Sequence, residues 1–234
     1  LHYPENASPD LIEKYRKLAG GGNDKEIGRA AIAEDLDRGV GELLAKLDEL
    51  GLSGTTYVIY MSDNGGSNRR TLMGGKGDVW EGGIRVPLIV RGPGVAANSW
   101  CHQRVVGYDW FPTFCGWADV TESLPANLDG GDISHLLAGS NEPVKRPREE
   151  LVFHFPHYQG DTPHSAILLG SHKLIEFYET GERRLFDLAS DIGERRDLAA
   201  EKPELAAQLA TRLHAYLKEV DASMPRLNSN FDVT

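Results

Sequence analysis

Apolar residues recur at three- and four-residue spacing through the first fifty positions, and this spacing is typical of amphipathic helices. A Ser-Pro-Asp sequence at residues 8–10 predicts a helix start, because it supplies a cap, a proline at the first helical position and an acid near the positive helix end. This helix should reach about Lys17 and break at residues 20–23. From Asp24 we expect a long helix that stops at Gly51. Its apolar positions are Ile27, Ala31, Leu36, Val40, Leu43, Leu44, Leu47 and Leu50.

Two continuous apolar runs predict strands that are buried on both faces. The first, residues 57–61, ends in the polar, glycine-containing sequence at 62–66, and the second, residues 86–90, leads into a turn at 91–94. A helix, a buried strand and a polar loop in this order indicate an α/β sheet, in which ligands bind beyond the carboxyl ends of the strands. Residues 65–94 contain nine of the 26 glycines, so the backbone there should turn tightly or pass close to another group.

The last third of the chain has a different pattern, which predicts a hairpin and a terminal helix. Residues 173–178 and 183–188 read as two strands around the turn sequence E-T-G-E. Pro203 opens an amphipathic helix. Its apolar positions are Leu205, Leu209, Leu213, Tyr216, Leu217 and Val220. Residues 138–150 are rich in Gly, Ser, Asn, Pro and charge, which indicates a boundary between two parts of the chain.

These patterns predict the fold class α/β, with a small α+β subdomain appended to it. Residues 1–145 should form the α/β sheet region, in which Asp109 caps a further helix that starts near Trp110. Residues 146–234 should form the α+β subdomain, with an antiparallel sheet and the terminal helix.

Composition and charge narrow the possible classes of protein. The net charge of −10, from 25 Lys and Arg against 35 Asp and Glu, argues against a nucleic-acid-binding protein and is compatible with cation binding. No window approaches the roughly 18 apolar residues of a membrane span. The two cysteines, Cys101 and Cys115, exclude a disulfide scaffold, and both are expected to be buried. The chain starts at Leu1 without a signal-peptide pattern and soon enters a motif, which we interpret as a fragment.

Several polar residues near the two predicted strands are candidates for chemistry. Asp63 and Asn64 offer hard oxygen ligands suited to Ca²⁺ or Mg²⁺, although they supply only part of a full shell and a plain Asn-Gly turn is an equal alternative. Lys76, flanked by glycines, can approach an anion together with backbone N–H groups, while a solvated loop lysine is the alternative. Glu81 and Arg85 form either an ion pair that braces the loop or part of a ligand site.

The histidines carry little information by themselves. A lone histidine near a terminus, such as His2, usually has no special role. The histidines of the last third lack the spacing of a helical metal site, and turns or core packing are the better interpretation for them. They are His154, His157, His164 and His172.

Taken together, the segments closely resemble the sulfatase family of the alkaline phosphatase superfamily. The specific part is T-x-Y-V-I-Y-M-S-D-N-G-G at residues 55–66, followed by G-G-K-G-x-x-W-E-G-G-I-R-V-P-L-I-V-R-G-P-G at residues 74–94. The weaker parts are H-Y-P at 2–4, Y-D-W-F-P-T at 108–113, L-D-G at 128–130, H-K-L at 172–174, L-F-D-L at 185–188 and D-I-G-E at 191–194. The likeness therefore runs over nearly the whole chain, which looks like the C-terminal portion of an arylsulfatase-like protein.

The resemblance implies roles for four residues. Asp63 and Asn64 would be ligands of the divalent cation, usually Ca²⁺ with Mg²⁺ as the alternative. Lys76 would contact the sulfate of the substrate, and His2 would hydrogen-bond the sulfate near its leaving oxygen. Such cations stabilise the charge that develops on the sulfuryl oxygens in the transition state. Glu81 and Arg85 belong to the motif and are assigned to the architecture of the loop.

The nucleophile segment of the family has no match in this sequence. Sulfatases carry a C/S-x-P/A-x-R segment whose Cys or Ser becomes formylglycine, whereas the residues after Cys101 and Cys115 fit neither position. We therefore expect no catalytic nucleophile in this chain, which alone should be inactive and should bind Ca²⁺ weakly at best. The formylglycine and paired metal-binding aspartates are expected in a missing N-terminal half.

The leading hypothesis is a fragment of an enzyme that hydrolyses sulfate monoesters, with sulfated small molecules or carbohydrates as partners. A phosphatase or phosphonate hydrolase of the same superfamily is the nearest alternative. A non-catalytic binding or accessory protein is the third hypothesis. The resemblance implies an exported (periplasmic or extracellular) or lysosomal protein. The net charge and the apolar windows predict no nucleic-acid partner and no membrane span.

Overall fold

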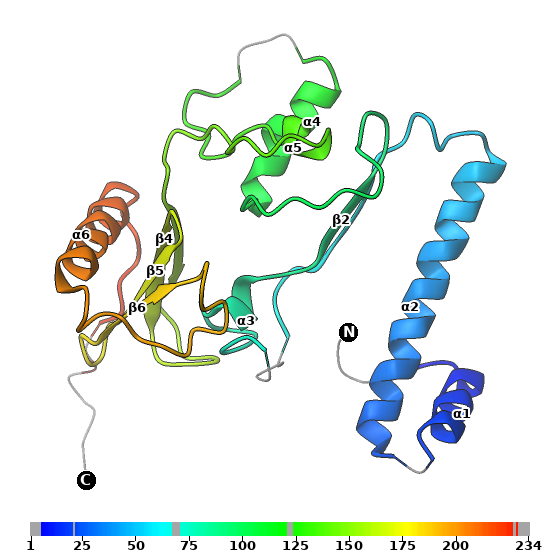
Figure 1. Ribbon diagram of the computed structural model, residues 1–234, viewed down its shortest axis with the longest axis horizontal. Coiled ribbons are helices and arrows are strands. Elements are labelled where there is room, and N and C mark those ends of the chain that lie inside the picture. The colour runs from blue at the N-terminus through cyan, green and yellow to red at the C-terminus, as the bar shows by residue number, and fades with distance from the viewer. Residues whose placement is uncertain (1–5, 21, 67–70, 121–123, 227, 229–234) are drawn as a thin grey trace. The chain divides into compact units, whose positions relative to one another are not determined.

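The computed structural model describes residues 6–20, 22–66, 71–120, 124–226 and 228, and Figure 1 shows its elements. The chain divides into two compact units. The first comprises Leu1–Val58 and Val90–Val95, and the second comprises Ile59–Ile89 and Ala96–Thr234. None of the described helices is both long enough and apolar enough to cross a membrane.

The first unit is a helical hairpin, in which the two predicted N-terminal helices are confirmed. Its helices are α1 (Pro9–Leu18) and α2 (Asp24–Glu49). Asn23 caps α2, since its side chain accepts a hydrogen bond from the Lys25 backbone N–H at 2.9 Å. The helices pack through Leu11, Ile27 and Ala31, which are all buried.

A two-stranded sheet is formed by β1 (Val58–Met61) and β2 (Leu88–Arg91). Both strands were expected from their apolar runs, but the expectation that they are buried on both faces is wrong for the described structure. Ile89 is 65% exposed and Met61 is 44% exposed. The physical reason is that a strand's side chains are covered by a second packed layer, and no residue of β1 or β2 belongs to either core cluster of the described residues.

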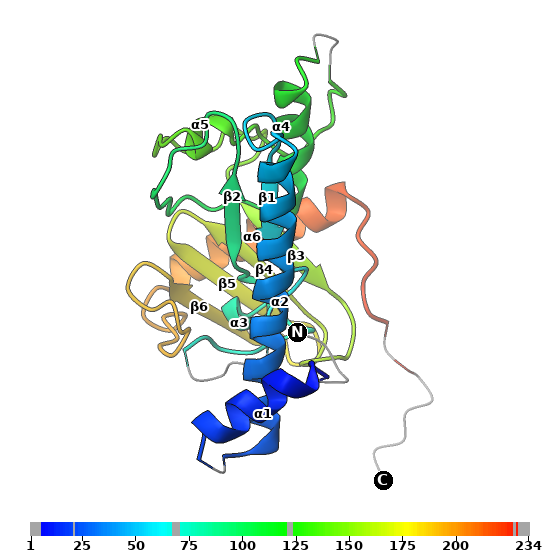
Figure 2. The ribbon, with the colours of Figure 1, turned by 90° about the vertical axis from the view of Figure 1, so that its right-hand side faces the viewer.

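A four-stranded antiparallel sheet forms the centre of the second unit, as Figure 2 shows. Its strands, in spatial order, are β3 (Leu151–Phe155), β4 (His164–Leu169), β5 (His172–Phe177) and β6 (Arg183–Asp187). The predicted hairpin is confirmed as β5 and β6. The strands β3 and β4 were not predicted.

Alternation of side chains gives this sheet two apolar faces, and both are covered. On one face lies the predicted terminal helix, here α6 (Pro203–Glu219). The other face packs against Val79 and Trp80, which precede the short helix α3 (Glu81–Ile84). Figure 1 shows α6 and α3 on opposite sides of the sheet. Burial of each large apolar side chain contributes about 1.5–3 kcal/mol, so the packing on both faces of the sheet stabilises this unit.

Packing against the α6 face involves Ile167, Leu174, Leu185, Leu198, Ala206, Leu209, Ala210, Leu213 and Leu217. On the α3 face the buried residues are Val79, Trp80, Leu151, Ala166, Leu168, Ile175, Phe177, Phe186 and Leu188. The division of the chain into residues 1–145 and 146–234 stays a prediction. The structure adds that residues 79 and 80 share a core with the C-terminal sheet.

Asp109 lies between a 3₁₀ turn (η1, Gly107–Asp109) and α4 (Trp110–Trp117). The predicted position of Asp109 is confirmed, since it is the N-cap residue of α4, but its side chain makes no capping hydrogen bond to this helix. It accepts hydrogen bonds from the backbone N–H groups of Val106 at 2.8 Å and Gly131 at 3.1 Å. Arg146 adds two charged donors, at 2.8 Å and 2.6 Å. Because these four donors converge on one carboxylate, Asp109 ties the helix start to the segment before α5 (Ser134–Leu137).

The expectation that both cysteines are buried is also wrong. Cys101 is exposed and Cys115 is half-buried. The buried positions of α4 are Trp110, Pro112 and Thr113, so Cys115 lies off the covered face of the helix.

Candidate active site

The residues after β1 form a tight polar loop that leaves a carboxylate in solvent. Ser62 Oγ donates to the Asn64 carbonyl at 3.0 Å, and Asn64 Nδ2 donates to Asp63 Oδ2 at 2.7 Å. Asp63 is exposed and Asn64 is half-buried. A carboxylate and a carboxamide therefore lie side by side at the end of the strand, where the sequence predicts metal ligands, and the amide nitrogen of Asn64 faces the carboxylate.

The lysine loop, defined as residues 71–80, lies directly against this polar loop. The Lys76 backbone N–H donates to the Gly66 carbonyl at 3.2 Å. The Gly65 N–H, one residue earlier in the polar loop, donates to the Gly83 carbonyl in the short helix α3 at 2.8 Å. The structure thus places the Lys76 backbone beside Gly66, two residues beyond Asn64. His2, the fourth predicted site residue, lies outside the described residues.

Asp78 gives the lysine loop its shape. Its Oδ2 accepts from the Gly75 N–H at 2.8 Å, and its Oδ1 accepts from the Trp80 N–H at 3.1 Å. Burial raises the pKa of the Asp78 carboxyl, and the two backbone donors oppose that shift. Lys76 lies inside the turn that Asp78 closes, and it is exposed. A carboxylate therefore holds the backbone while the lysine remains free to meet an anion.

Gly65→Ala should lower the free energy of unfolding by about 1–3 kcal/mol, the usual range for overpacking. A Cβ at Gly65 would lie 1.8 Å from the Gly82 carbonyl oxygen, so backbone would have to move. Urea unfolding followed by circular dichroism measures the change. Gly54→Ala is the matched control, because no atom lies within 4 Å of its added Cβ. Equal stability of the two variants would contradict the close approach of the loops.

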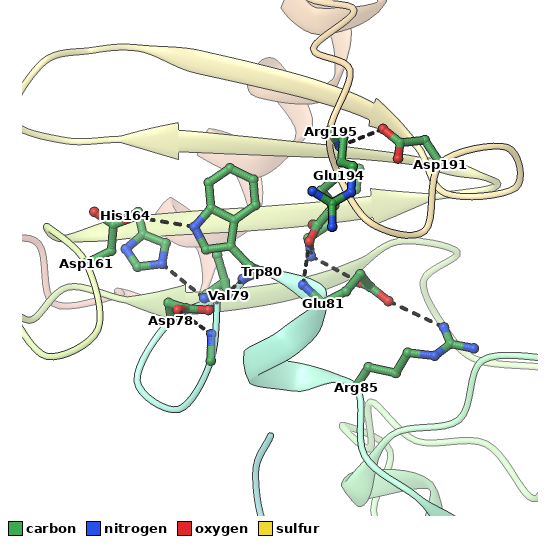
Figure 3. A network of polar contacts seen from close by, with 12 residues as sticks. Asp78, Val79, Trp80, Glu81, Arg85, Asp161, His164, Asp191, Glu194 and Arg195 are labelled. Atoms are coloured by element: carbon green, nitrogen blue, oxygen red, sulfur yellow. Dashed lines mark hydrogen bonds and ion pairs between the residues drawn. The ribbon is translucent and has the colours of Figure 1, made fainter. Parts of the chain in front are cut away.

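The lysine loop is fastened to the C-terminal sheet at residues 79 and 80 (Figure 3). The Val79 N–H donates to His164 Nε2 at 3.0 Å, which requires that this ring nitrogen is unprotonated. The other ring nitrogen of His164 then donates to the Thr162 carbonyl. Trp80 Nε1 donates to Asp161 Oδ2 at 3.3 Å. His164 is fully buried, so it serves core packing, as its sequence context indicated.

A buried charge cluster lies beneath α3. Lys173 is fully buried, and its Nζ lies 3.1 Å from Glu81 Oε1 and 2.7 Å from Glu194 Oε1. The second of these is an ion pair without hydrogen-bond geometry. Glu194 Oε2 accepts from the Glu81 backbone N–H at 2.7 Å. The predicted ion pair between Glu81 and Arg85 is confirmed at 3.4 Å, but sequence reasoning missed Lys173 and Glu194.

Stability should depend on pH through Glu194. Burial raises the pKa of its carboxyl above the ordinary 4.5, while Lys173 opposes the shift. The folded state then binds this proton more tightly than the unfolded state, so the contribution of Glu194 to stability falls as pH rises from 4.5 through the raised value. Glu194→Gln should therefore show a flatter decline of unfolding free energy across this window. Urea titrations at several pH values measure the slope, and an unchanged slope would contradict the assignment.

The described residues supply only part of a metal-binding site. Among them, no group of three or more His, Cys, Asp or Glu side chains could hold a metal ion. Asp63 and Asn64 fit a hard cation, since both present oxygen ligands from a loop at a strand end. A complete shell of six or more oxygens requires further ligands.

The sequence of this chain is similar to those of known proteins. Residues 2–120 match the Sulfatase family model, and residues 75–223 match the model for the C-terminal region of N-sulphoglucosamine sulphohydrolase. A sulfatase of Formosa agariphila is 32% identical over 89% of this chain and 43% of its own length. Human arylsulfatase A is 29% identical over 95% of this chain and 48% of its own length. The chain thus spans somewhat less than half of these relatives.

The fold of this chain is similar to the folds of several solved structures. Ps i-CgsB superposes with a TM-score of 0.82 at 25% identity, over 96% of this chain and 49% of that one. A protein solved in complex with its substrate D-Glucosamine-2-N, 6-O-disulfate gives 0.66 at 24%, over 93% and 47%. The phosphonate monoester hydrolase of Agrobacterium radiobacter gives 0.65 at 25%, over 84% and 41%.

The fold is therefore of the α/β, alkaline-phosphatase-like class, and its loops after β1 and before α3 form a candidate cation- and anion-binding site. The chain belongs to the sulfatase family, as the resemblance of its motifs implied. It corresponds to the C-terminal portion of these relatives.

Proposed function

We propose that the polypeptide containing this chain hydrolyses sulfate monoesters and that this chain supplies part of the active site. The observation that carries the proposal is the backbone hydrogen bond from Lys76 to Gly66, at 3.2 Å. It joins a loop with an exposed ammonium to a loop with an exposed carboxylate and an amide. The family match supports the same reaction.

In this proposal Lys76 binds a sulfuryl oxygen as a point charge. Its loop is held by Asp78, Val79 and Trp80, so little reorganisation is needed when charge develops on that oxygen. Asp63 and Asn64 would hold a divalent cation, Ca²⁺ or Mg²⁺. When bound, that cation supplies further charge stabilisation at the sulfate. His2 would donate a hydrogen bond near the leaving oxygen, a role that the family resemblance supports.

The nucleophile of the reaction is proposed to be a formylglycine in sequence outside this chain, since neither cysteine lies in the required segment. The family resemblance also favours an exported or lysosomal compartment. Carbohydrate sulfates are the favoured substrates, because a similar fold was solved with a glucosamine disulfate as its substrate.

A phosphonate or phosphate ester hydrolase is the second candidate. The similarity to a phosphonate monoester hydrolase, at 25% identity, is the observation that favours it. The two candidates share the geometry of a tetrahedral anion beside a cation, so the substrate assay has to separate them.

The test is to express the full product of the gene that encodes this chain and to compare para-nitrophenyl sulfate, phosphate and phenylphosphonate esters as substrates. A higher kcat/KM for the sulfate than for the phosphorus esters supports the proposal. Preference for a phosphorus ester supports the second candidate. A folded product without activity on any of the three overturns both.

Lys76→Ala in that product should lower kcat/KM for the sulfate ester about 10²–10³-fold, the usual effect of removing one preorganised donor to a developing oxyanion. The fold should be unaffected, because the Lys76 side chain is exposed and its backbone bond remains. Steady-state kinetics and thermal unfolding measure the two effects. Lys218→Ala is the matched control, an exposed lysine on α6. Wild-type kinetics in Lys76→Ala would rule out the assigned contact.

A further inference from the structure

The loop between β3 and β4, residues 156–163, packs directly on the lysine loop. The Gly160 N–H donates to the Gly77 carbonyl at 3.1 Å. A Cβ at Gly160 would lie 3.0 Å from the Lys76 carbonyl oxygen. The side chain of Gln159 contacts Gly77, where an added Cβ would lie 2.7 Å from Gln159 Cγ. Residues 159 and 160 are therefore immediate neighbours of the backbone that carries the Lys76 side chain.

Further contacts fix this loop in place. Asp161 accepts from the indole of Trp80, and His164 accepts from the Val79 N–H. The Tyr158 hydroxyl donates to the carboxylate of Glu179, in the turn between β5 and β6. Because the β3–β4 loop is tied both to the lysine loop and to the sheet, its side chains keep a defined position relative to Lys76.

Two polar side chains of the β3–β4 loop are exposed to solvent and could bind a ligand. His157 and Gln159 are exposed, and within the described part of the chain they make no hydrogen bond or ion pair. The only described contact of the His157 ring is edge-on with Phe155, at 5.5 Å between centroids. The ring of Tyr158, between them in sequence, is 70% exposed. An imidazole, an amide and an aromatic face thus occur in three consecutive residues beside the lysine loop.

We propose that His157 and Gln159 bind the alcohol portion of the sulfate ester and select a carbohydrate there. This rests on the proposed function, in which Lys76 holds the sulfate. Imidazole and amide groups both donate and accept hydrogen bonds, which matches the hydroxyl groups of a sugar ring. An exposed tyrosine ring offers an amphipathic surface for the same ring. An aryl group offers no such hydroxyl partners to the two polar side chains.

The experiment compares two substrates in the full gene product, para-nitrophenyl sulfate and the best-cleaved member of a panel of monosulfated hexoses. His157→Ala and Gln159→Ala should each lower kcat/KM for the sugar sulfate about 3–10-fold, mainly through KM, as expected for one lost hydrogen bond. For His157→Ala, whose ring contacts Phe155 in the described structure, activity on para-nitrophenyl sulfate should stay within about twofold of wild type. For Gln159→Ala, which also removes packing on Gly77, the loss on the sugar sulfate should exceed the loss on para-nitrophenyl sulfate. Gln208→Ala, an exposed glutamine on α6, is the matched control.

Three other results would contradict either the role of the two residues, the substrate class or the proposed function. Equal losses on both substrates, or no loss on either, overturn the assignment of His157 and Gln159 and leave the sulfatase activity standing. A wild-type enzyme that cleaves the aryl sulfate but no sugar sulfate overturns the inferred substrate class. A folded wild type that cleaves neither sulfate overturns the proposed function itself.

Discussion

Lys173→Met should lower the free energy of unfolding by about 3–5 kcal/mol, the usual cost of breaking a buried ion pair on one side. Lys173 is fully buried and lies between the carboxylates of Glu81 and Glu194. Methionine fills much of the same space without the charge, so the loss reports on electrostatics more than on packing. Two carboxylates would then face each other in a region from which water is excluded. Urea unfolding at neutral pH measures the effect.

A double variant tests whether the loss of stability in Lys173→Met comes from the lost charge or from changed packing. Lys173→Met combined with Glu194→Gln should recover part of the loss, since it also removes the carboxylate charge that had paired with Lys173 at 2.7 Å. Lys218→Met, at an exposed position of α6, should change stability by less than about 0.5 kcal/mol. If Lys173→Met were as stable as wild type, the buried cluster beneath α3 would be refuted.

Asp109→Ala should also cost about 3–5 kcal/mol, because it leaves a charged partner without compensation. The Asp109 side chain is fully buried, and that of Arg146 is 9% exposed. Without the carboxylate, the guanidinium loses its counter-charge and the N–H groups of Val106 and Gly131 lose their acceptor. Thermal and urea unfolding both report the change.

The double variant Asp109→Ala with Arg146→Met tests whether the two residues act as one pair. A coupling energy of at least about 1 kcal/mol is expected, because each single change removes the same interaction. Asp37→Ala, at an exposed position of α2, is the control and should be near neutral. Strictly additive effects of the two changes would contradict the pairing of Asp109 with Arg146.

The periodic spacing of apolar residues predicted those helices and strands in which the spacing continues over several turns or along both arms of a hairpin. The helices α1, α2 and α6 and the hairpin of β5 and β6 agree with their expected positions. Two short strands, β3 and β4, were missed because the loop that joins them, residues 156–163, is longer than a tight hairpin turn and gives no local turn signal like E-T-G-E. The burial of β1 and β2 was overestimated, since an apolar run reports what a strand can bury rather than what covers it.

The residues of the candidate site also fall into two groups, those that a local motif indicates and those that no local motif indicates. The roles of Asp63, Asn64 and Lys76 stay predictions that rest on one block of motifs, and backbone hydrogen bonds join the loops that carry these residues. Lys173 and Glu194 were missed, because a lysine on a strand normally indicates the solvent face. Its partner Glu81 lies 92 residues away in sequence, and Glu194 contacts the Glu81 backbone over 113 residues. No local pattern contains information on such distant pairs.

The fastening of the lysine loop to the C-terminal sheet has a consequence for synthesis on the ribosome. Val79 meets His164 after a further 85 residues and Glu81 meets Glu194 after 113. At about 5–20 residues per second, the nascent chain carries the large indole of Trp80 without its core for roughly 5–20 seconds. A premature stop codon between positions 165 and 190 would release a polypeptide with the complete 55–94 block and no Glu194 to support it.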